Sequence, residues 1–163
     1  MVGLGRMGAN MTQRLLRGGH RVVGFDFTPE ARRGVEQHGA DTVAALEALV
    51  AKLAPPRVLW LMVPSGAATE STVNALLLLL KPGDTVVDGG NSNYKDTQRR
   101  SLLFADKQLN YVDCGTSGGV WGLAEGGNSV SPRLEDRSRS CPSLGQRWKV
   151  SQPGDGEGSQ GNH

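Results

Sequence analysis

Gly3-Leu4-Gly5-Arg6-Met7-Gly8 stands at the start of the chain, where Met7, Met11 and Leu15 then recur every four residues. Three glycines in a G-x-G-x-x-G pattern before a helical stripe are typical of a turn that approaches a pyrophosphate. The first glycine permits a tight turn, the second leaves room for the phosphate, and the third lets the helix pack closely. The anion would lie at the helix N-terminus, where N–H groups lack partners.

Only Met1 and Val2 precede this turn. A parallel strand inside a sheet usually has about five or six residues. We therefore expect a truncated first strand and a weakly anchored phosphate turn.

The chain up to residue 126 alternates short β-rich runs with longer helical patterns. We expect strands at residues 20–25, 58–63, 84–88 and 109–113, and helices that start near residue 6 and at residues 30–38, 43–53, 67–80 and 94–106. This alternation predicts an α/β fold with a Rossmann-like, doubly wound parallel sheet. Glycine clusters follow the strands, at the sheet edge where such folds bind ligands.

Asp26 ends the expected strand at residues 20–25 and lies 18 residues after Gly8. An acidic residue at this position typically binds the ribose hydroxyls of a dinucleotide and repels a 2′-phosphate. Phe27 follows where an arginine would favour the phosphate. The sequence thus predicts NAD rather than NADP as the cofactor, with a solvated acid at a strand end as the alternative reading of Asp26.

Four motifs together resemble a known family. They are Gly3–Met11, Val63-Pro64-Ser65-Gly66, Asp88-Gly89-Gly90-Asn91-Ser92-Asn93-Tyr94-Lys95-Asp96 and Gly115-Thr116-Ser117-Gly118-Gly119-Val120-Trp121-Gly122. In order and spacing they resemble decarboxylating 6-phosphogluconate dehydrogenase, in particular its short bacterial branch, over residues 1–126. The resemblance implies oxidation of 6-phosphogluconate at C3 by hydride transfer to a nicotinamide, followed by decarboxylation to ribulose 5-phosphate.

The resemblance also implies roles for individual residues. Pyrophosphate would be held by Gly3, Leu4, Gly5, Arg6, Met7 and Gly8, and the adenosine ribose by Asp26, Phe27 and Thr28. Val63, Pro64 and Ser65 would line the cofactor cleft. Asn91 would face both cofactor and substrate, while Ser117, Gly118 and Gly119 would hold the sugar acid. For Gly89-Gly90 and Gly118-Gly119 the alternative is simple turn formation.

The chemistry of the family needs a base that this sequence does not offer. Its acid-base lysine stands in a Lys-x-x-His-Asn pattern, and none of the five lysines here is followed by His-Asn at that offset. We therefore predict no catalytic residue in this chain and leave its status as an enzyme open. Two cysteines and scattered histidines predict no metal site.

Residues 127–163 differ in composition from the rest of the chain. Only 6 of these 37 residues are apolar, whereas Gly, Ser and Pro supply 16. Such a segment buries too little apolar surface to offset its conformational entropy. We predict a nucleotide-binding domain at residues 1–126 and a disordered, non-native tail at residues 127–163. We attribute the tail to a shifted reading frame or a mis-called gene end, and we expect the helical dimerisation domain of the family to be absent.

Charge and hydropathy exclude other classes of protein. The net charge of +2 without a basic cluster argues against a nucleic-acid partner. The apolar run at residues 75–80 is far shorter than the roughly 20 residues of a membrane span. No signal peptide is recognised, so we expect a cytoplasmic chain with no membrane partner.

Three functions remain open. The first is an NAD(P)-binding fragment of a 6-phosphogluconate dehydrogenase, with a 6-phosphogluconate-like sugar acid as partner. The second is a fragment of a related 3-hydroxyacid dehydrogenase, against which Asn91 argues, because those enzymes tend to have Ser-Thr in place of Gly-Gly-Asn-Ser. The third is a non-catalytic nucleotide-binding module.

Overall fold

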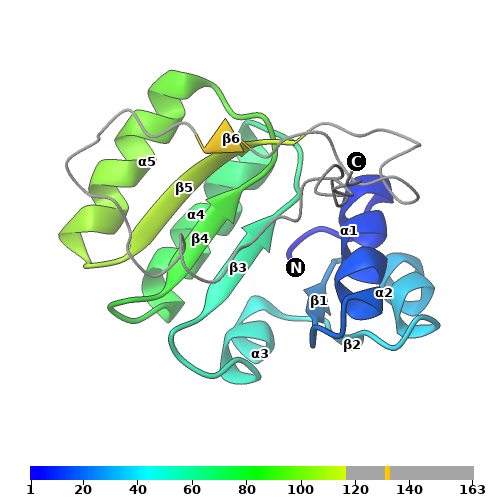
Figure 1. Ribbon diagram of the computed structural model, residues 1–163. Coiled ribbons are helices and arrows are strands. Elements are labelled where there is room, and N and C mark those ends of the chain that lie inside the picture. The colour runs from blue at the N-terminus through cyan, green and yellow to red at the C-terminus, as the bar shows by residue number, and fades with distance from the viewer. Residues whose placement is uncertain (117–130, 133–163) are drawn as a thin grey trace, which may run out of the picture.

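The computed structural model describes residues 1–116 and 131–132 as an α/β fold (Figure 1). The helices are α1 (Arg6–Arg17), α2 (Pro29–Glu36), α3 (Leu46–Ala51), α4 (Ala67–Leu79) and α5 (Tyr94–Asp106). The strands are β1 (Val23–Phe25), β2 (Asp41–Val43), β3 (Val58–Leu61), β4 (Thr85–Asp88), β5 (Asn110–Gly115) and β6 (Ser131–Pro132).

The strands pair in the doubly wound order that the sequence predicts. β1 pairs in parallel with β2, and β3, β4 and β5 pair in parallel with one another. Val2 bridges Phe25 of β1 and Leu61 of β3, both in parallel, and so joins the two groups of strands. The order in which strands are added to the sheet therefore reverses between β1 and β3, next to the N-terminus (Figure 1).

Met1 and Val2, the two residues before the phosphate turn, are hydrogen-bonded to the chain on both sides. Val2 donates to the Trp60 carbonyl at 2.8 Å and accepts from Met62 N at 2.7 Å. On the other side, Phe25 N donates to the Met1 carbonyl and Gly3 N to the Phe25 carbonyl, both at 2.9 Å. Val2 is fully buried. Neighbouring strands thus hold the phosphate turn from both sides, contrary to the weak anchoring expected from the sequence.

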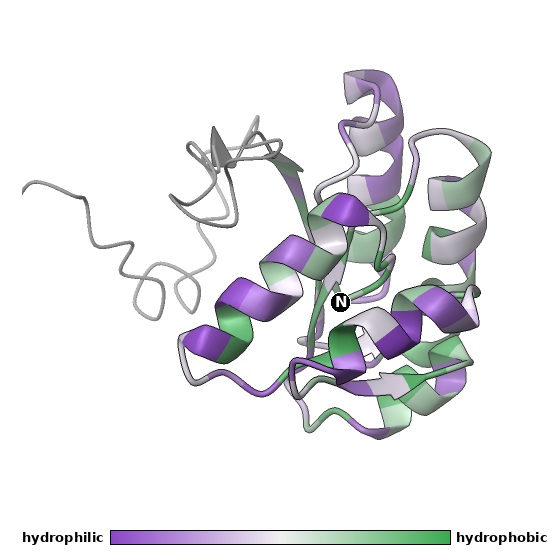
Figure 2. Ribbon diagram, turned by 90° about the vertical axis from the view of Figure 1, so that its right-hand side faces the viewer, coloured by the Kyte–Doolittle hydropathy of each residue, from purple (hydrophilic) through white to green (hydrophobic). Residues whose placement is uncertain are grey.

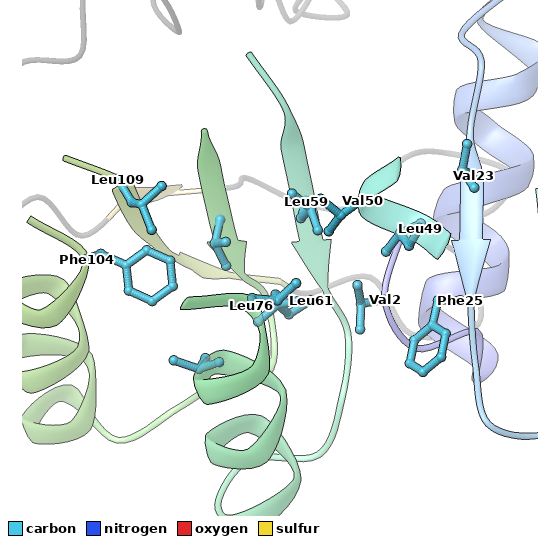
Figure 3. Packing of buried hydrophobic residues seen from close by; sticks show 12 residues of the cluster. Val2, Val23, Phe25, Leu49, Val50, Leu59, Leu61, Leu76, Phe104 and Leu109 are labelled. Atoms are coloured by element: carbon cyan, nitrogen blue, oxygen red, sulfur yellow. The ribbon is translucent and has the colours of Figure 1, made fainter. Parts of the chain in front are cut away.

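Apolar side chains fill both faces of the sheet. On one face Val2, Leu61, Leu76 and Phe104 belong to a cluster beneath α3, α4 and α5 (Figure 3). On the other face a smaller cluster contains Met1, Leu4, Val22, Val35 and Ala40, with side chains of α1 and α2 packed against it. In Figure 2 hydrophilic and hydrophobic residues alternate along the helices nearest the viewer, as expected for helices with one face in a core.

Two expected elements differ from those observed. Val43, expected in a helix, ends strand β2, because its backbone pairs with Phe25 of β1. Ser131 and Pro132, in the segment predicted to be disordered, pair antiparallel with Gly115 and Cys114 at the edge of β5. The rest of that predicted tail, and the domain boundary at residue 126, lie outside the described residues.

The leucine run at the end of α4 is split between core and surface. Leu76 is fully buried, whereas the side chain of Leu78 is 82% exposed.

Among the residues that the structure describes, no helix has the length and apolar character needed to cross a lipid bilayer.

Candidate functional site

The turn at Gly3–Gly8 is shaped by close backbone contacts. Gly3 has φ +88, and a Cβ there would lie 2.5 Å from the Met62 carbonyl oxygen. A Cβ on Gly8 would lie 1.9 Å from the Gly3 carbonyl oxygen. Gly5 is different, because nothing lies within 4 Å of its Cβ position. The outer glycines close the turn and the middle one leaves open space, as the sequence predicts for a phosphate-binding turn.

The open space lies at the N-terminus of α1. Gly5 is the N-cap, no side chain caps the helix, and its first turn contains no acidic residue. Arg6, in that first turn, is exposed and lines the pocket described below. Unpaired N–H groups, the helix dipole and this guanidinium therefore all favour an anion.

Asp26 lies directly after β1 and is fixed by the backbone of two loops. Its Oδ2 accepts a hydrogen bond from Leu4 N and its Oδ1 accepts one from Thr28 N, both at 2.8 Å. The Arg32 guanidinium donates to the carbonyl oxygens of Asp26 and Phe27, at 2.6 and 3.2 Å. The carboxylate is thus not the freely solvated acid of the alternative reading, although each oxygen keeps a further acceptor site.

Phe27 extends from this loop toward solvent. Its side chain is 81% exposed, and its ring packs edge-on against Phe25 with a centroid separation of 5.0 Å. The exposed ring beside the Asp26 carboxylate also lines the pocket described below.

A pocket of about 990 Å³ follows the carboxyl edge of the sheet from the phosphate turn to the loop after β4. Predicted residues in its lining are Gly3, Gly5, Arg6, Met7, Gly8, Asp26, Phe27, Val63, Pro64 and Asn91. Leu4, Thr28 and Ser65 lie outside this lining, and Ser117, Gly118 and Gly119 lie outside the described residues. The structure thus brings most of the predicted cofactor residues to one cavity.

Sequence reasoning missed other residues of this lining. They are Leu46, Met62, Ala68, Ser71, Thr72, Ala75, Gly89, Gly90 and Thr116. Ser71, Thr72 and Ala75 face the pocket from α4, which has no motif of its own. Small residues recurring at three- and four-residue spacing on this helix are a signal that could have pointed to a ligand-facing side.

The loop after β4 presents Asn91 to the pocket. Asn91 is exposed and has φ +56, in the left-handed region. Gly89 and Gly90 have no positive φ, but a Cβ on Gly89 would lie 2.6 Å from Trp60 Nε1 and one on Gly90 2.6 Å from the Val63 carbonyl oxygen. Close packing against neighbouring atoms therefore requires glycine at both positions.

Asp88 binds the chain on both sides of Asn91. Its Oδ1 accepts from Gly90 N at 3.0 Å, and its Oδ2 accepts from Ser92 Oγ at 2.6 Å. Tyr111 Oη donates to the same Oδ2 at 2.7 Å. Burial and the neighbouring Asp88 carboxylate raise the pKa of Tyr111 well above its usual value, so this phenol stays a donor.

Arg100 of α5 completes this cluster from beneath. Its Nη1 donates to Asp88 Oδ2 at 3.2 Å and to Ser92 Oγ at 2.9 Å. Its Nη2 donates to Glu70 Oε2 on α4 at 2.9 Å. The side chains of Arg100 and Asp88 are both 0% exposed. The sequence suggested only a polar helix at residues 94–106 and gave no signal for a buried arginine.

In the described part of the chain, the other reactive side chains form no metal-binding cluster. Burial raises the pKa of the Cys114 thiol to about 11, with Asp113 and Asp88 adding to the effect. Lys95 and Lys107 are exposed, as are His20 and His38. Within residues 1–116 and 131–132, no group of three His, Cys, Asp or Glu side chains could hold a metal ion.

Comparison with known families identifies the described domain. The NAD-binding domain of 6-phosphogluconate dehydrogenase matches residues 1–132. The NAD(+)-dependent, decarboxylating 6-phosphogluconate dehydrogenase of Haloferax volcanii is 40% identical over 126 residues, which are 77% of this chain and 41% of that protein. The chain thus spans about two fifths of the length of this relative.

Solved structures show the same fold. Plasmodium falciparum 6-phosphogluconate dehydrogenase, studied with NADP+ and with 6-phosphogluconate, gives a TM-score of 0.69 at 26% identity and covers 75% of this chain and 27% of that one. Mycobacterium tuberculosis 3-hydroxyisobutyrate dehydrogenase, with L-serine, gives 0.68 at 30% identity and covers 74% and 40%.

Proposed function

The chain belongs to the family of the NAD-binding domain of 6-phosphogluconate dehydrogenase, and from this membership we propose that it binds NAD and presents the nicotinamide to a sugar acid such as 6-phosphogluconate. The observation that carries the proposal is the continuous pocket that contains both the open phosphate turn at Gly5 and the Asn91 loop. A dinucleotide needs a pyrophosphate site and a nicotinamide site within one continuous cavity.

Each part of the pocket has a task in this proposal. The N-terminus of α1 and Arg6 bind the pyrophosphate, and Asp26 accepts hydrogen bonds from the ribose hydroxyls. Val63 and Pro64 line the middle of the cavity. Asn91, with two amide donors and one acceptor, orients the nicotinamide and the sugar acid. Bound nicotinamide supplies the hydride acceptor for oxidation of a hydroxyl group.

NAD is proposed as the preferred cofactor because of Asp26. Its carboxylate faces the pocket and would repel a 2′-phosphate. The Haloferax volcanii relative is named as NAD(+)-dependent, whereas the Plasmodium falciparum enzyme takes NADP+. Both cofactors thus occur among relatives, and the charge at residue 26 is the feature that favours NAD here.

We expect the 163-residue chain to bind cofactor without forming NADH by itself. No lysine of this chain is followed by His-Asn in the pattern that supplies the base of the family. Ser117, Gly118 and Gly119 remain proposed contacts to the sugar acid. Residues 1–126 remain the proposed binding domain and residues 127–163 the proposed tail.

Calorimetric titration of the purified chain with NAD and with NADP tests the proposal. We expect saturable binding of NAD and at least tenfold weaker binding of NADP, which corresponds to about 1.4 kcal/mol. Failure of both nucleotides to bind would remove the proposed function. Binding of NADP with higher affinity would leave a dehydrogenase domain but reverse the cofactor assignment.

A second candidate is a 3-hydroxyacid dehydrogenase domain, which the likeness to the Mycobacterium tuberculosis structure favours. The two candidates differ in the acid that binds beside the nicotinamide. With NAD present, 6-phosphogluconate and 3-hydroxyisobutyrate are titrated in parallel, and the acid that perturbs the Asn91 side-chain amide signals identifies the candidate.

A further inference from the structure

We propose that Arg100, Asp88 and Ser92 form a clamp that positions Asn91 for the nicotinamide end of the cofactor. Arg100 is then a positioning residue, because it acts through Asn91. The role of Asn91 toward nicotinamide rests on the proposed function; the clamping of its backbone does not.

Asn91 needs external support to keep its conformation. Its φ of +56 lies in the left-handed region, which is unfavourable for an L-residue, although asparagine tolerates it better than most. Such conformations persist where surrounding structure over-determines them, and they concentrate at ligand sites. A support for this backbone is therefore expected close to Asn91 in the chain.

Asp88 supplies that support on both sides. Gly90 N and Ser92 Oγ, from the residues before and after Asn91, both donate to its carboxylate at 3.0 and 2.6 Å. The two bonds hold the ends of a three-residue arch, with Asn91 at its centre. Thr116 Oγ1 donates to the Gly89 carbonyl at 2.7 Å and fixes the base of the arch to the chain after β5.

Arg100 fixes the orientation of the Asp88–Ser92 pair. A single nitrogen, Nη1, donates to both Asp88 Oδ2 and Ser92 Oγ. Nη2 and Nε of the same guanidinium donate to Glu70 Oε2 on α4, at 2.9 and 3.3 Å. The rigid fork thus connects α4, α5 and the arch, which a flexible ammonium cannot do with the same geometry.

The burial of this cluster points to positioning rather than to stability. Arg100 and Asp88 are fully buried, and removing two charges from water offsets much of the energy gained by pairing them. Apolar side chains of similar volume often stabilise a fold as well or better. The buried ion pair of Arg100 and Asp88 is therefore better explained by its effect on the orientation of the loop at residues 90–92, to which both side chains are hydrogen-bonded.

Two variants weaken the clamp in different ways. Arg100→Lys keeps the positive charge but loses the fork, and Ser92→Ala removes one hydroxyl while leaving Arg100 paired with Asp88 and Glu70. Arg99→Lys is the matched control, because Arg99 pairs with Glu70 and Asp96 and is half exposed. Thermal unfolding of each variant establishes that it is folded before binding is measured.

The first measurement concerns the free protein. NMR backbone couplings and amide signals report the left-handed conformation of Asn91 without any ligand. We expect both clamp variants to lose or average this conformation, whereas Arg99→Lys retains it. If Asn91 keeps the wild-type couplings in Ser92→Ala and in folded Arg100→Lys, the clamp proposal is wrong, whether or not the chain binds NAD.

The second measurement separates the two ends of the cofactor. ADP-ribose carries the ribose and pyrophosphate but no nicotinamide, so it reports the Gly3–Gly8 and Asp26 end alone. We expect NAD affinity to fall about tenfold in both clamp variants and in Asn91→Ala, with ADP-ribose affinity within about twofold of wild type. Equal losses for NAD and ADP-ribose would show general damage to the pocket and overturn the proposal.

A double substitution tests whether Arg100 acts through Asn91. If it does, Arg100→Lys adds little to the loss of NAD affinity that Asn91→Ala already causes, since coupled residues are non-additive. Fully additive losses would contradict the proposal. Absence of NAD binding by the wild-type chain would refute the proposed function, and the clamp would then be judged by the first measurement.

Discussion

Leu4 N donates a 2.8 Å hydrogen bond to Asp26 Oδ2 and so connects the phosphate turn with the loop after β1. The two residues are 22 positions apart in the chain, and both loops lie at the carboxyl edge of the sheet. Asp26 therefore holds the phosphate turn in place as well as facing the proposed ribose site. Substitutions at Asp26 are expected to affect both.

Asp26→Asn is expected to weaken NAD binding and to reduce the discrimination against NADP. The amide is neutral, and only its oxygen accepts hydrogen bonds, so one of the two bonds from Leu4 N and Thr28 N is lost. Loss of a charge-assisted hydrogen bond costs about 1.5–3 kcal/mol. Titration with both nucleotides should show the ratio of NADP to NAD affinity rising at least tenfold, while Glu30→Gln, an exposed charge change in α2, leaves it unchanged.

Gly8→Ala and Gly5→Ala form a matched pair: the first is expected to lower the stability of the fold, and the second to lower the affinity for NAD. The new methyl group at residue 8 would lie 1.9 Å from the Gly3 carbonyl oxygen, so the turn must move and the free energy of unfolding should fall by about 3 kcal/mol or more. At residue 5 the methyl group meets no protein atom within 4 Å but occupies the proposed phosphate space.

Chemical denaturation and NAD titration separate the two effects. Gly5→Ala should unfold at nearly the wild-type denaturant concentration and lose NAD affinity. Equal stability of Gly8→Ala and wild type would contradict the close contact with Gly3.

Asp84→Asn tests the buried ion pair between Asp84 and Arg57. Asp84 directly precedes β4, so this pair lies at the amino edge of the sheet, whereas the pocket lies at the carboxyl edge. The carboxylate is desolvated, but hydrogen bonds from Lys81 N, Arg57 N and the Arg57 guanidinium hold the pKa of Asp84 below its usual value. A lowered pKa in the folded state means that ionised Asp84 stabilises the fold fully above its unfolded pKa near 4, and that this contribution disappears as pH falls through the folded pKa.

Unfolding free energies near pH 7 and pH 3 measure this linkage. Near pH 7 the variant should lose about 3 kcal/mol, because breaking a buried pair leaves a charge without its partner. The gap between wild type and variant should narrow in acid. Asp106→Asn, at an exposed position, serves as the control. A gap that is constant with pH would contradict the role given to Asp84.

Cys114 is expected to resist thiol reagents in the folded protein. The thiolate is the reactive form, and a pKa of about 11 leaves very little of it near pH 8. A Cys141→Ser variant isolates Cys114 for a disulfide-exchange assay. Labelling should be slow in buffer and fast in denaturant. Rapid stoichiometric labelling of the folded chain would contradict the burial of Cys114.

Much of the fold could be read from local patterns. The four-residue recurrence after the glycine turn and the alternation of β-rich runs with helical patterns predicted α1, α2, α4 and α5 with bounds close to those observed. These signals act within a few residues, so they need no knowledge of the partners. Val43 was misplaced because a three-residue strand has too few residues to show a period, and its identity depends on pairing with β1.

The candidate site was only partly predictable for the same reason. The phosphate turn and Asp26 follow one another at fixed spacing on consecutive elements, and that spacing is visible in the sequence. Ser71, Thr72 and Thr116 reach the pocket from α4 and from the chain after β5. Their contribution depends on strand order, which brings distant segments to one edge of the sheet.

The sequence by itself determined the βα alternation, the position of the glycine turn and the acidic residue that follows β1, because each depends on short-range geometry and residue chemistry. Tertiary structure alone decided that Val2 joins the two groups of strands, since its bridges to Phe25 of β1 and Leu61 of β3 depend on segments far away in the chain. It also decided that Arg100 is buried against Asp88 and Ser92, because only the tertiary placement of α4, α5 and β4 brings Glu70 and Asp88 to the same guanidinium.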